Sequence, residues 1–125
     1  MAHPGLFVYG TLLSGEPNAS MLGALARRPA LVFGRIYHLP AGYPAVTLGG
    51  DQPVHGELLP TLSPSLLRLL DHYEGLEDGL YRRVEVRAIT GLEQHPAWIY
   101  VMDDPEARGG RRIPSGRWRS FDHQR

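Results

Sequence analysis

A short apolar strand runs into a glycine and a hydroxyl residue near the start of the chain, in the segment Phe7-Val8-Tyr9-Gly10-Thr11-Leu12. Gly10 has no β-carbon, so the backbone there can turn sharply or let a ligand approach closely. After such a turn, successive backbone N–H groups can converge on one point and hold an anion or a carbonyl oxygen. Tyr9 to Leu12 are therefore candidate ligand-binding residues. A plain turn at the end of a strand is the simpler interpretation of this segment taken alone.

A second segment, Leu70-Asp71-His72-Tyr73-Glu74-Gly75, places a carboxylate at the end of an expected helix. The C-terminus of a helix carries partial negative charge, and Asp71 lies three residues back on the same side. Both effects disfavour a second negative charge, so we predict that the pKa of Glu74 is raised. A glutamate with a raised pKa is a better general base at neutral pH than an ordinary surface glutamate. The alternative is a solvated acid in an acidic stretch with Glu77 and Asp78.

The composition excludes several kinds of catalytic site. The chain has no cysteine, and all 13 of its basic residues are arginine. A thiolate nucleophile, a thiolate metal site, a Schiff-base lysine and a P-loop are therefore impossible. No serine lies in a Gly-x-Ser-x-Gly context, and the 6 histidines show no metal-binding spacing. Catalysis would have to come from Asp, Glu, His, Tyr, Arg or backbone groups.

Length and charge fit one soluble domain. The 125 residues can bury a core, and 42% hydrophobic with 21% charged residues is ordinary for a globular protein. A net charge of +0 gives no general attraction to nucleic acid. There is no apolar run of membrane-spanning length and no signal-peptide pattern. We therefore expect a cytoplasmic protein without membrane or nucleic-acid partners, and the sequence leaves its oligomeric state open.

The two candidate segments have to be positioned by a mixture of strands and helices. The clearest helix is predicted over residues 64–73, because Ser63 can cap it, Pro64 suits its first position and Gly75 suits the residue beyond its end. The clearest strand is predicted over 80–89, where apolar residues alternate with charged ones. This mixture favours an α+β domain. A short helix capped by Asn18 and five further strands complete the expected order: residues 6–9, 30–39, 45–48, 54–59 and 97–102.

Arg82 opens the alternating part of the 80–89 strand. Strict alternation places Arg82 on the inward face, together with Val84 and Val86. An inward arginine normally pairs with a carboxylate. We favour a structural acid as the partner of Arg82 over a carboxylate of a ligand.

Residues 103–125 form an irregular, arginine-rich tail, with Trp118 and Phe121 as expected anchors on the domain. Basic residues interleaved with aromatic ones can bind single-stranded nucleic acid. Acidic residues in the same tail balance its charge, which favours a tail packed on the domain instead.

Several segments resemble, in order along the chain, the motifs of the gamma-glutamylcyclotransferase-like family. Residues 7–12 with Gly15-Glu16-Pro17-Asn18 are similar to its opening segment, most of all in the gamma-glutamylamine cyclotransferases and their small bacterial relatives. Residues 69–75, followed by Leu80-Tyr81-Arg82-Arg83, resemble its catalytic segment. The other similar segments extend the resemblance over nearly the whole chain: Tyr43-Pro44-Ala45, Val54-His55-Gly56-Glu57-Leu58, Trp98-Ile99-Tyr100 and Ile113-Pro114-Ser115-Gly116-Arg117-Trp118.

The resemblance implies both a fold and a site. The fold would be a compact α+β domain over residues 1–125, built around a mixed β-barrel or roll with one or two short helices. Glu74 would be the catalytic acid and base. The residues that bind a γ-glutamyl group, largely through main-chain N–H groups or as aromatic walls, would be Tyr9, Gly10, Thr11, Leu12, Tyr81 and Tyr100.

The implied reaction is an intramolecular aminolysis of a γ-glutamyl amine or related γ-glutamyl compound, which closes 5-oxoproline and releases an amine. Glu74 would take a proton from the α-amine and pass it to the leaving nitrogen, and no metal or cofactor is required. The loop amides could hold either the α-carboxylate or the developing oxyanion. Two alternatives stay open: a γ-glutamyl deprotection enzyme of specialised metabolism, and a non-catalytic module that binds a small anion. The sequence does not identify the leaving amine.

Overall fold

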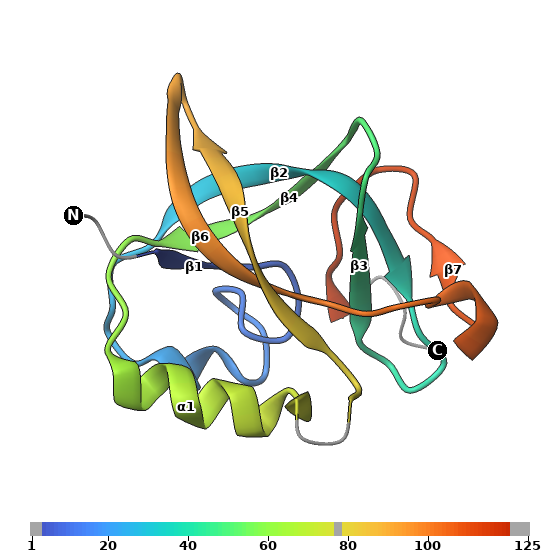
Figure 1. Cartoon of the computed structure of the whole chain (residues 1–125), viewed down its shortest axis with the longest axis horizontal. Helices are drawn as coiled ribbons and strands as arrows, with labels where there is room; N and C mark the ends of the chain where they lie inside the picture. The colour runs from blue at the N-terminus through green and yellow to red at the C-terminus, as the bar shows by residue number, and fades with distance from the viewer. Residues whose placement is uncertain (1–3, 77–78, 121–125) are drawn as a thin grey trace.

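The computed structural model describes residues 4–76 and 79–120, and its strands form one curved sheet around a barrel (Figure 1). The strands are β1 (Gly5–Val8), β2 (Arg28–His38), β3 (Pro44–Leu48), β4 (Gln52–Leu59), β5 (Arg82–Thr90), β6 (Glu93–Val101) and β7 (Arg111–Arg112). The barrel closes in the order β2, β4, β1, β6 and β5, with β5 returning to β2. Because β1 runs parallel to β6 and the other neighbours are antiparallel, the barrel is mixed, as expected. Both β3 and β7 extend the sheet from β2.

The α-helix α1 (Pro64–Tyr73) has the bounds that the sequence predicts. The Ser63 hydroxyl oxygen accepts the Leu66 N–H at 3.2 Å, which caps the first turn, and Pro64 occupies the first helical position. Gly75, with φ +70°, ends the helix in a left-handed conformation. Among the described residues no helix is long and apolar enough to cross a membrane.

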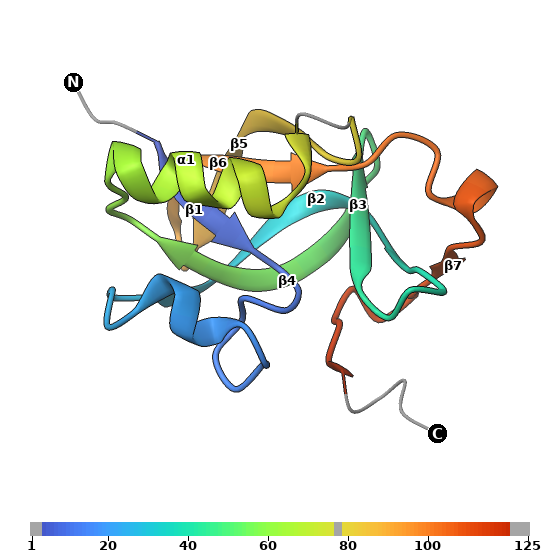
Figure 2. The same ribbon diagram turned by 90° about the horizontal axis from the view of Figure 1, so that it is seen from below.

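Strand β1 is buried on both faces because it stands between two apolar clusters. Phe7 points into the barrel, where it packs with residues such as Ile36 and Ile99. Leu6 and Val8 point to the opposite face, where Leu70 of α1 and its neighbours cover them. Successive strand residues alternate in direction, so one short apolar run serves both layers. Figure 1 shows α1 along one side of the barrel, and Figure 2 shows it lying across β1.

Trp118 anchors the end of the chain on this core. Its side chain is 1% exposed and belongs to the cluster inside the barrel. The indole N–H donates to His38 Nδ1 at 3.0 Å. Phe121, the other expected anchor, lies outside the described residues.

The prediction that Arg82 points inward is wrong. Arg82 is exposed and forms a bidentate pair with Asp103, at 3.1 and 3.0 Å, so its partner is a structural acid but a surface one. Arg83 is the half-buried arginine, and its Nε lies 2.9 Å from Asp71 Oδ1. Alternation fails as a guide here because α1 covers the outer face of the barrel, so an outward residue of β5 is also shielded from water.

The bounds of the other strands differ from the predicted ones by one or two residues, and larger differences occur at the start of β6 and at the cap of the short helix. Strand β6 begins at Glu93 instead of residue 97, because residues 93–96 pair with residues 87–90 of β5 at the end of the β5–β6 hairpin (Figure 1). Asn18 precedes a 3₁₀ helix, η1 (Ala19–Leu22), but its side chain makes no capping bond, so the prediction of an Asn18 cap is wrong.

Candidate active site

A cavity of about 340 Å³ lies between the turn after β1, the loop from β2 to β3 and the C-terminal end of α1. This volume is at the lower end of the range for small-molecule sites. Its lining brings together all the site residues that the sequence predicts: Tyr9, Gly10, Thr11, Leu12, Glu74, Tyr81 and Tyr100. It also contains residues that the sequence analysis did not assign to the site: Phe7, Val8, Asn18, Gly42, Tyr43, Pro44, Tyr73 and Leu80.

The turn after β1 lines the cavity with Gly10, Thr11 and Leu12. The Leu13 N–H donates to the Gly10 carbonyl at 3.0 Å, which closes the turn. No partner within the described residues accepts the N–H of Gly10, Thr11 or Leu12. All three residues line the cavity, so their N–H groups are candidates to bind a ligand. Consecutive unpaired N–H groups of this kind suit an anionic or carbonyl oxygen.

Glu74 follows the last residue of α1, is half-buried and lines the same cavity. Its N–H donates to the Leu70 carbonyl at 2.8 Å, so the end of the helix fixes its backbone. Burial away from water raises the pKa of Glu74 from 4.5 to about 7, because it disfavours the charged form. The predicted direction of the shift is confirmed. Its cause is burial, whereas the sequence pointed to the helix terminus and to Asp71.

Asp71 is occupied by other partners. The Tyr100 hydroxyl donates to Asp71 Oδ1 at 2.8 Å, and Arg83 Nε lies 2.9 Å from the same atom. The Arg83 guanidinium also lies 4.4 Å from the centre of the Trp98 ring. These contacts balance the Asp71 charge before it can act on Glu74. Glu77 and Asp78, the other acids of this stretch, lie outside the described residues.

Three buried tyrosines form cavity walls whose hydroxyls already donate to the protein. The Tyr9 hydroxyl donates to the Tyr100 carbonyl at 2.6 Å, and the Tyr81 hydroxyl donates to the Pro44 carbonyl at 2.7 Å. Burial raises the pKa of Tyr9, Tyr81 and Tyr100 above the ordinary value for a phenol, so all three stay uncharged near neutral pH. They therefore offer the cavity aromatic faces and fixed positions.

Tyr73, Thr11 and Asn18 form a polar rim that sequence reasoning missed as a group. Asn18 Nδ2 donates to the Tyr73 hydroxyl at 2.5 Å, and Thr11 Oγ1 lies 3.1 Å from the same hydroxyl. In the contact between the Thr11 and Tyr73 hydroxyls, only one of the two donates its hydrogen. The hydrogen of the other hydroxyl therefore remains available to a ligand. The rim joins the turn after β1 to the end of α1. The residues are far apart in the chain, and no local pattern pairs them.

Within the described part of the chain, Glu74 is the only charged side chain in the cavity wall. The residues that the structure describes contain no cluster of His, Cys, Asp and Glu that could hold a metal ion. The lining thus combines one carboxyl group that can exchange a proton near neutral pH with a turn whose unpaired main-chain N–H groups can hold negative charge.

Solved structures with a similar fold come from distant organisms. YkqA from Bacillus subtilis has a TM-score of 0.73 and 28% identity, over 94% of this chain and 40% of YkqA. An AIG2-like protein from Mus musculus has a TM-score of 0.70 and 22% identity, over 94% of this chain and 90% of that protein. These likenesses confirm the expected α+β fold around a mixed barrel.

Comparison of the sequence finds a curated relative and a matching family model. The gamma-L-glutamyl-butirosin B gamma-glutamyl cyclotransferase of Niallia circulans is 35% identical over 104 residues, which are 78% of this chain and 66% of that protein. The chain therefore spans slightly less than two thirds of the length of this relative. A family model described as "Gamma-glutamyl cyclotransferase, AIG2-like" matches residues 6–120. The chain belongs to the gamma-glutamyl cyclotransferase, AIG2-like family.

Proposed function

We propose that this protein is a cyclotransferase that converts a γ-glutamyl amine, or a related γ-glutamyl compound, into 5-oxoproline and a free amine. The proposal depends on one observation. Glu74, with a pKa of about 7, lines the same cavity as the unpaired N–H groups of Gly10, Thr11 and Leu12. Membership of the family and the activity named for the Niallia circulans relative support it.

Glu74 acts as the proton carrier in this proposal. The substrate α-amine is an ammonium group at neutral pH and has to lose a proton before it can attack its own γ-carbonyl carbon. The new C–N bond closes the lactam ring, and the original amide C–N bond breaks. Two protons leave the attacking nitrogen and both end on the released amine, so the Glu74 carboxylate is regenerated. A carboxyl group whose pKa lies near the working pH suits both directions of transfer, and such catalysis contributes roughly 10²–10⁴-fold.

The turn after β1 holds the negative charge of the substrate. The N–H groups of Gly10 to Leu12 donate to the α-carboxylate or to the oxyanion that forms on the γ-carbonyl. The rings of Tyr9, Tyr81 and Tyr100 keep the glutamyl chain curled so that the amine stays close to the carbonyl. Holding reacting groups in this way can contribute about 7–11 kcal/mol.

A narrower candidate is the removal of a γ-glutamyl group from an amine of a larger specialised metabolite. The Niallia circulans relative is named for γ-L-glutamyl-butirosin B, which motivates this candidate. The same cavity chemistry would serve both candidates, and they differ only in the leaving amine. The proposal places this chemistry in the cytoplasm, a compartment that fits a chain without cysteine.

Incubation with a panel of γ-glutamyl compounds in ¹⁸O-labelled water tests the function. The panel should include γ-glutamyl-ε-lysine, γ-glutamyl dipeptides, glutathione and γ-glutamyl amides of larger amines. Mass spectrometry should find 5-oxoproline without ¹⁸O, because cyclisation takes no oxygen from water. Labelled glutamate would show hydrolysis instead. Tight binding without any product would favour the non-catalytic alternative.

A further inference from the structure

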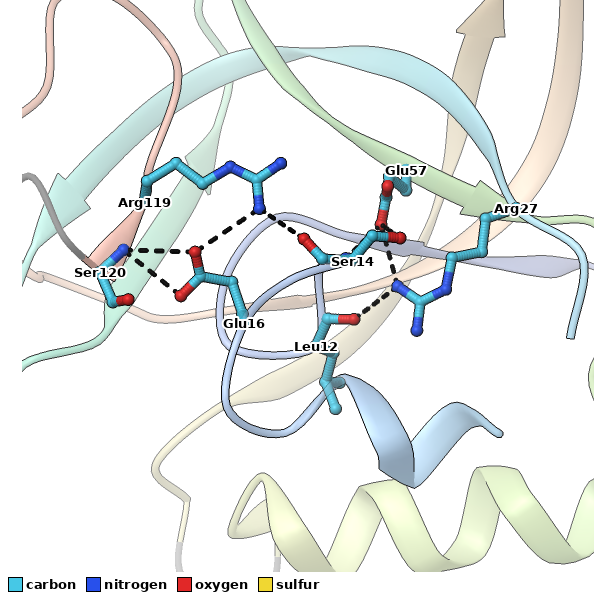
Figure 3. A network of polar contacts seen from close by, with 7 residues as sticks. All are labelled: Leu12, Ser14, Glu16, Arg27, Glu57, Arg119 and Ser120. Carbon is cyan, nitrogen blue, oxygen red and sulfur yellow. Dashed lines mark hydrogen bonds and ion pairs between the residues drawn. The ribbon is translucent and has the colours of Figure 1, made fainter. Parts of the chain in front are cut away.

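An ion pair between Arg27 and Glu57 contacts the turn after β1, which contributes residues to the cavity wall (Figure 3). Arg27 Nη1 lies 2.9 Å from Glu57 Oε1, with 13% of the arginine and 19% of the glutamate side chain exposed. Arg27 precedes β2, and Glu57 belongs to β4. A buried ion pair contributes little net stability, because both charges lose water. The position of this pair therefore calls for a role besides stability.

The Arg27–Glu57 pair forms hydrogen bonds with the main chain of the turn and of the residues that follow it. Arg27 donates to the Leu12 carbonyl at 2.6 Å and to the Ala19 carbonyl at 3.1 Å. Glu57 Oε1 accepts the Ser14 N–H at 2.8 Å and lies 3.2 Å from the Ser14 hydroxyl oxygen, which donates to it. The turn has no regular secondary structure over residues 10–18, so these contacts fix its path.

A second arginine, from the C-terminal tail, holds the same turn from another side (Figure 3). Arg119 Nη1 donates to the Ser14 carbonyl at 2.7 Å and lies 3.5 Å from Glu16 Oε2. The Ser120 N–H donates to the Glu16 carboxylate at 3.4 Å, and Glu16 is 8% exposed. Glu57 and Arg119 thus fix the N–H and the carbonyl of Ser14, one from the barrel and one from the tail.

We propose that Arg27, Glu57 and Arg119 are positioning residues for the cyclisation, an inference that rests on the proposed function. None of them lines the cavity, so each acts through the turn that it holds. They keep the unpaired N–H groups of residues 10–12 in place before the substrate binds. Main-chain donors stabilise developing charge only if they are preorganised, and a displacement of about 1 Å can lower the rate roughly 10²-fold.

Substitutions in the buried pair test this role against a matched surface pair. R27M and E57L should lower kcat/KM by roughly 10- to 100-fold at temperatures well below their Tm. E57Q keeps an acceptor for the Ser14 N–H and should recover most of that loss. R28M is the control, because Arg28 is the first residue of β2, next to Arg27 in the chain, but pairs at the surface with Glu93, at 3.8 Å. The acidic limb of the pH profile should stay unchanged in all variants, because none of them contacts Glu74.

A tail variant gives an independent arm if R27M does not fold. Arg119 is 39% exposed, so R119M removes its donor from a partly open site. R119M should lower kcat/KM, and R119K should recover it by donating to the Ser14 carbonyl. A fall in Tm with kcat/KM within about twofold of wild type in R27M, E57L and R119M would overturn the proposal, because a misplaced turn should cost much more.

Hydrogen exchange separates this proposal from the proposed function, since it needs no turnover. The N–H groups of Leu13, Glu16 and Asn18 make the internal hydrogen bonds of the turn, at 3.0 Å each. Their exchange should accelerate in R27M and E57L and stay at the wild-type rate in R28M. If wild type makes no product, the proposed function fails, and the exchange rates still decide the positioning role. Unchanged exchange in R27M and E57L would overturn it.

Discussion

The ring of Pro44 fills the space that a side chain at Gly10 would occupy. A β-carbon built on Gly10 would stand 2.6 Å from Pro44 Cγ and 2.9 Å from Pro44 Cδ. Gly10 is not among the glycines with positive φ, so the position needs glycine for close approach and not for a left-handed turn. Both residues line the cavity. Their contact therefore sets the distance between the main-chain donors and the facing loop.

The substitution G10A should overpack this contact. We expect a loss of roughly 1–3 kcal/mol in the free energy of unfolding, measured by urea denaturation. Activity should fall with it, since the turn is pushed out of place. In G10A/P44A the ring is gone, so the double variant should be more stable than the sum of the single changes implies. A G10A variant with wild-type stability and activity would contradict the contact.

The acidic limb of kcat/KM should lie near pH 7. Glu74 acts as a base only when deprotonated, and its pKa in the free enzyme is about 7. The limb of kcat should lie at lower pH, because the bound ammonium group favours the charged carboxylate. Steady-state rates between pH 5 and 9 measure both limbs. A limb of kcat/KM near 4.5, the ordinary value for glutamate, would show that Glu74 is not held in this environment.

Neutralising Asp71 should leave that limb in place. Tyr100 and Arg83 already balance the Asp71 charge, so D71N should move the limb by less than about half a pH unit. Stability should fall by roughly 1–3 kcal/mol, because Arg83 loses its charged partner in a half-buried site. The same kinetic profile and urea denaturation measure the two effects. A limb one unit lower would mean that repulsion from Asp71 holds the pKa of Glu74 up.

Glu74 should also make stability depend on pH. Its folded-state pKa of about 7 lies above the unfolded value of 4.5. Between these values the folded state keeps a proton that the unfolded state has lost, so the free energy of unfolding falls as pH rises. Above pH 7 the loss from this group is complete, at about 3 kcal/mol. E74Q lacks the effect, so its stability relative to wild type should grow from pH 5 to pH 8 in urea denaturation. A constant difference would contradict the shifted pKa.

Local signals in the sequence were sufficient for the helix that carries Glu74. The backbone conformation at each end of α1 favours the residue type found there: Ser63 as the cap, Pro64 at the first position and Gly75 beyond the end. The bounds of α1 therefore follow from residues that are close together in the chain. The apolar run of β1 was equally readable, because burial on both faces leaves no polar position.

Contacts between distant segments could not be read in this way. Alternation placed Arg82 inward, but the helix packed on the barrel shields Arg83 instead. Asn18 carries a capping residue type, yet Tyr73 takes its side chain. The direction of the Glu74 shift was right for a different reason, since burial depends on how the cavity walls meet. No local sequence pattern predicts the hydrogen bond from Arg27 to the Leu12 carbonyl, because the two residues lie far apart in the chain.

Turnover by E74Q tests the central claim most directly. The amide keeps the shape of the side chain and cannot carry a proton between the two nitrogens. We expect 5-oxoproline formation to fall by at least about 10²-fold, while E74Q still binds added 5-oxoproline. If E74Q keeps more than about a tenth of the wild-type rate, Glu74 is not the proton carrier and the proposed mechanism is wrong.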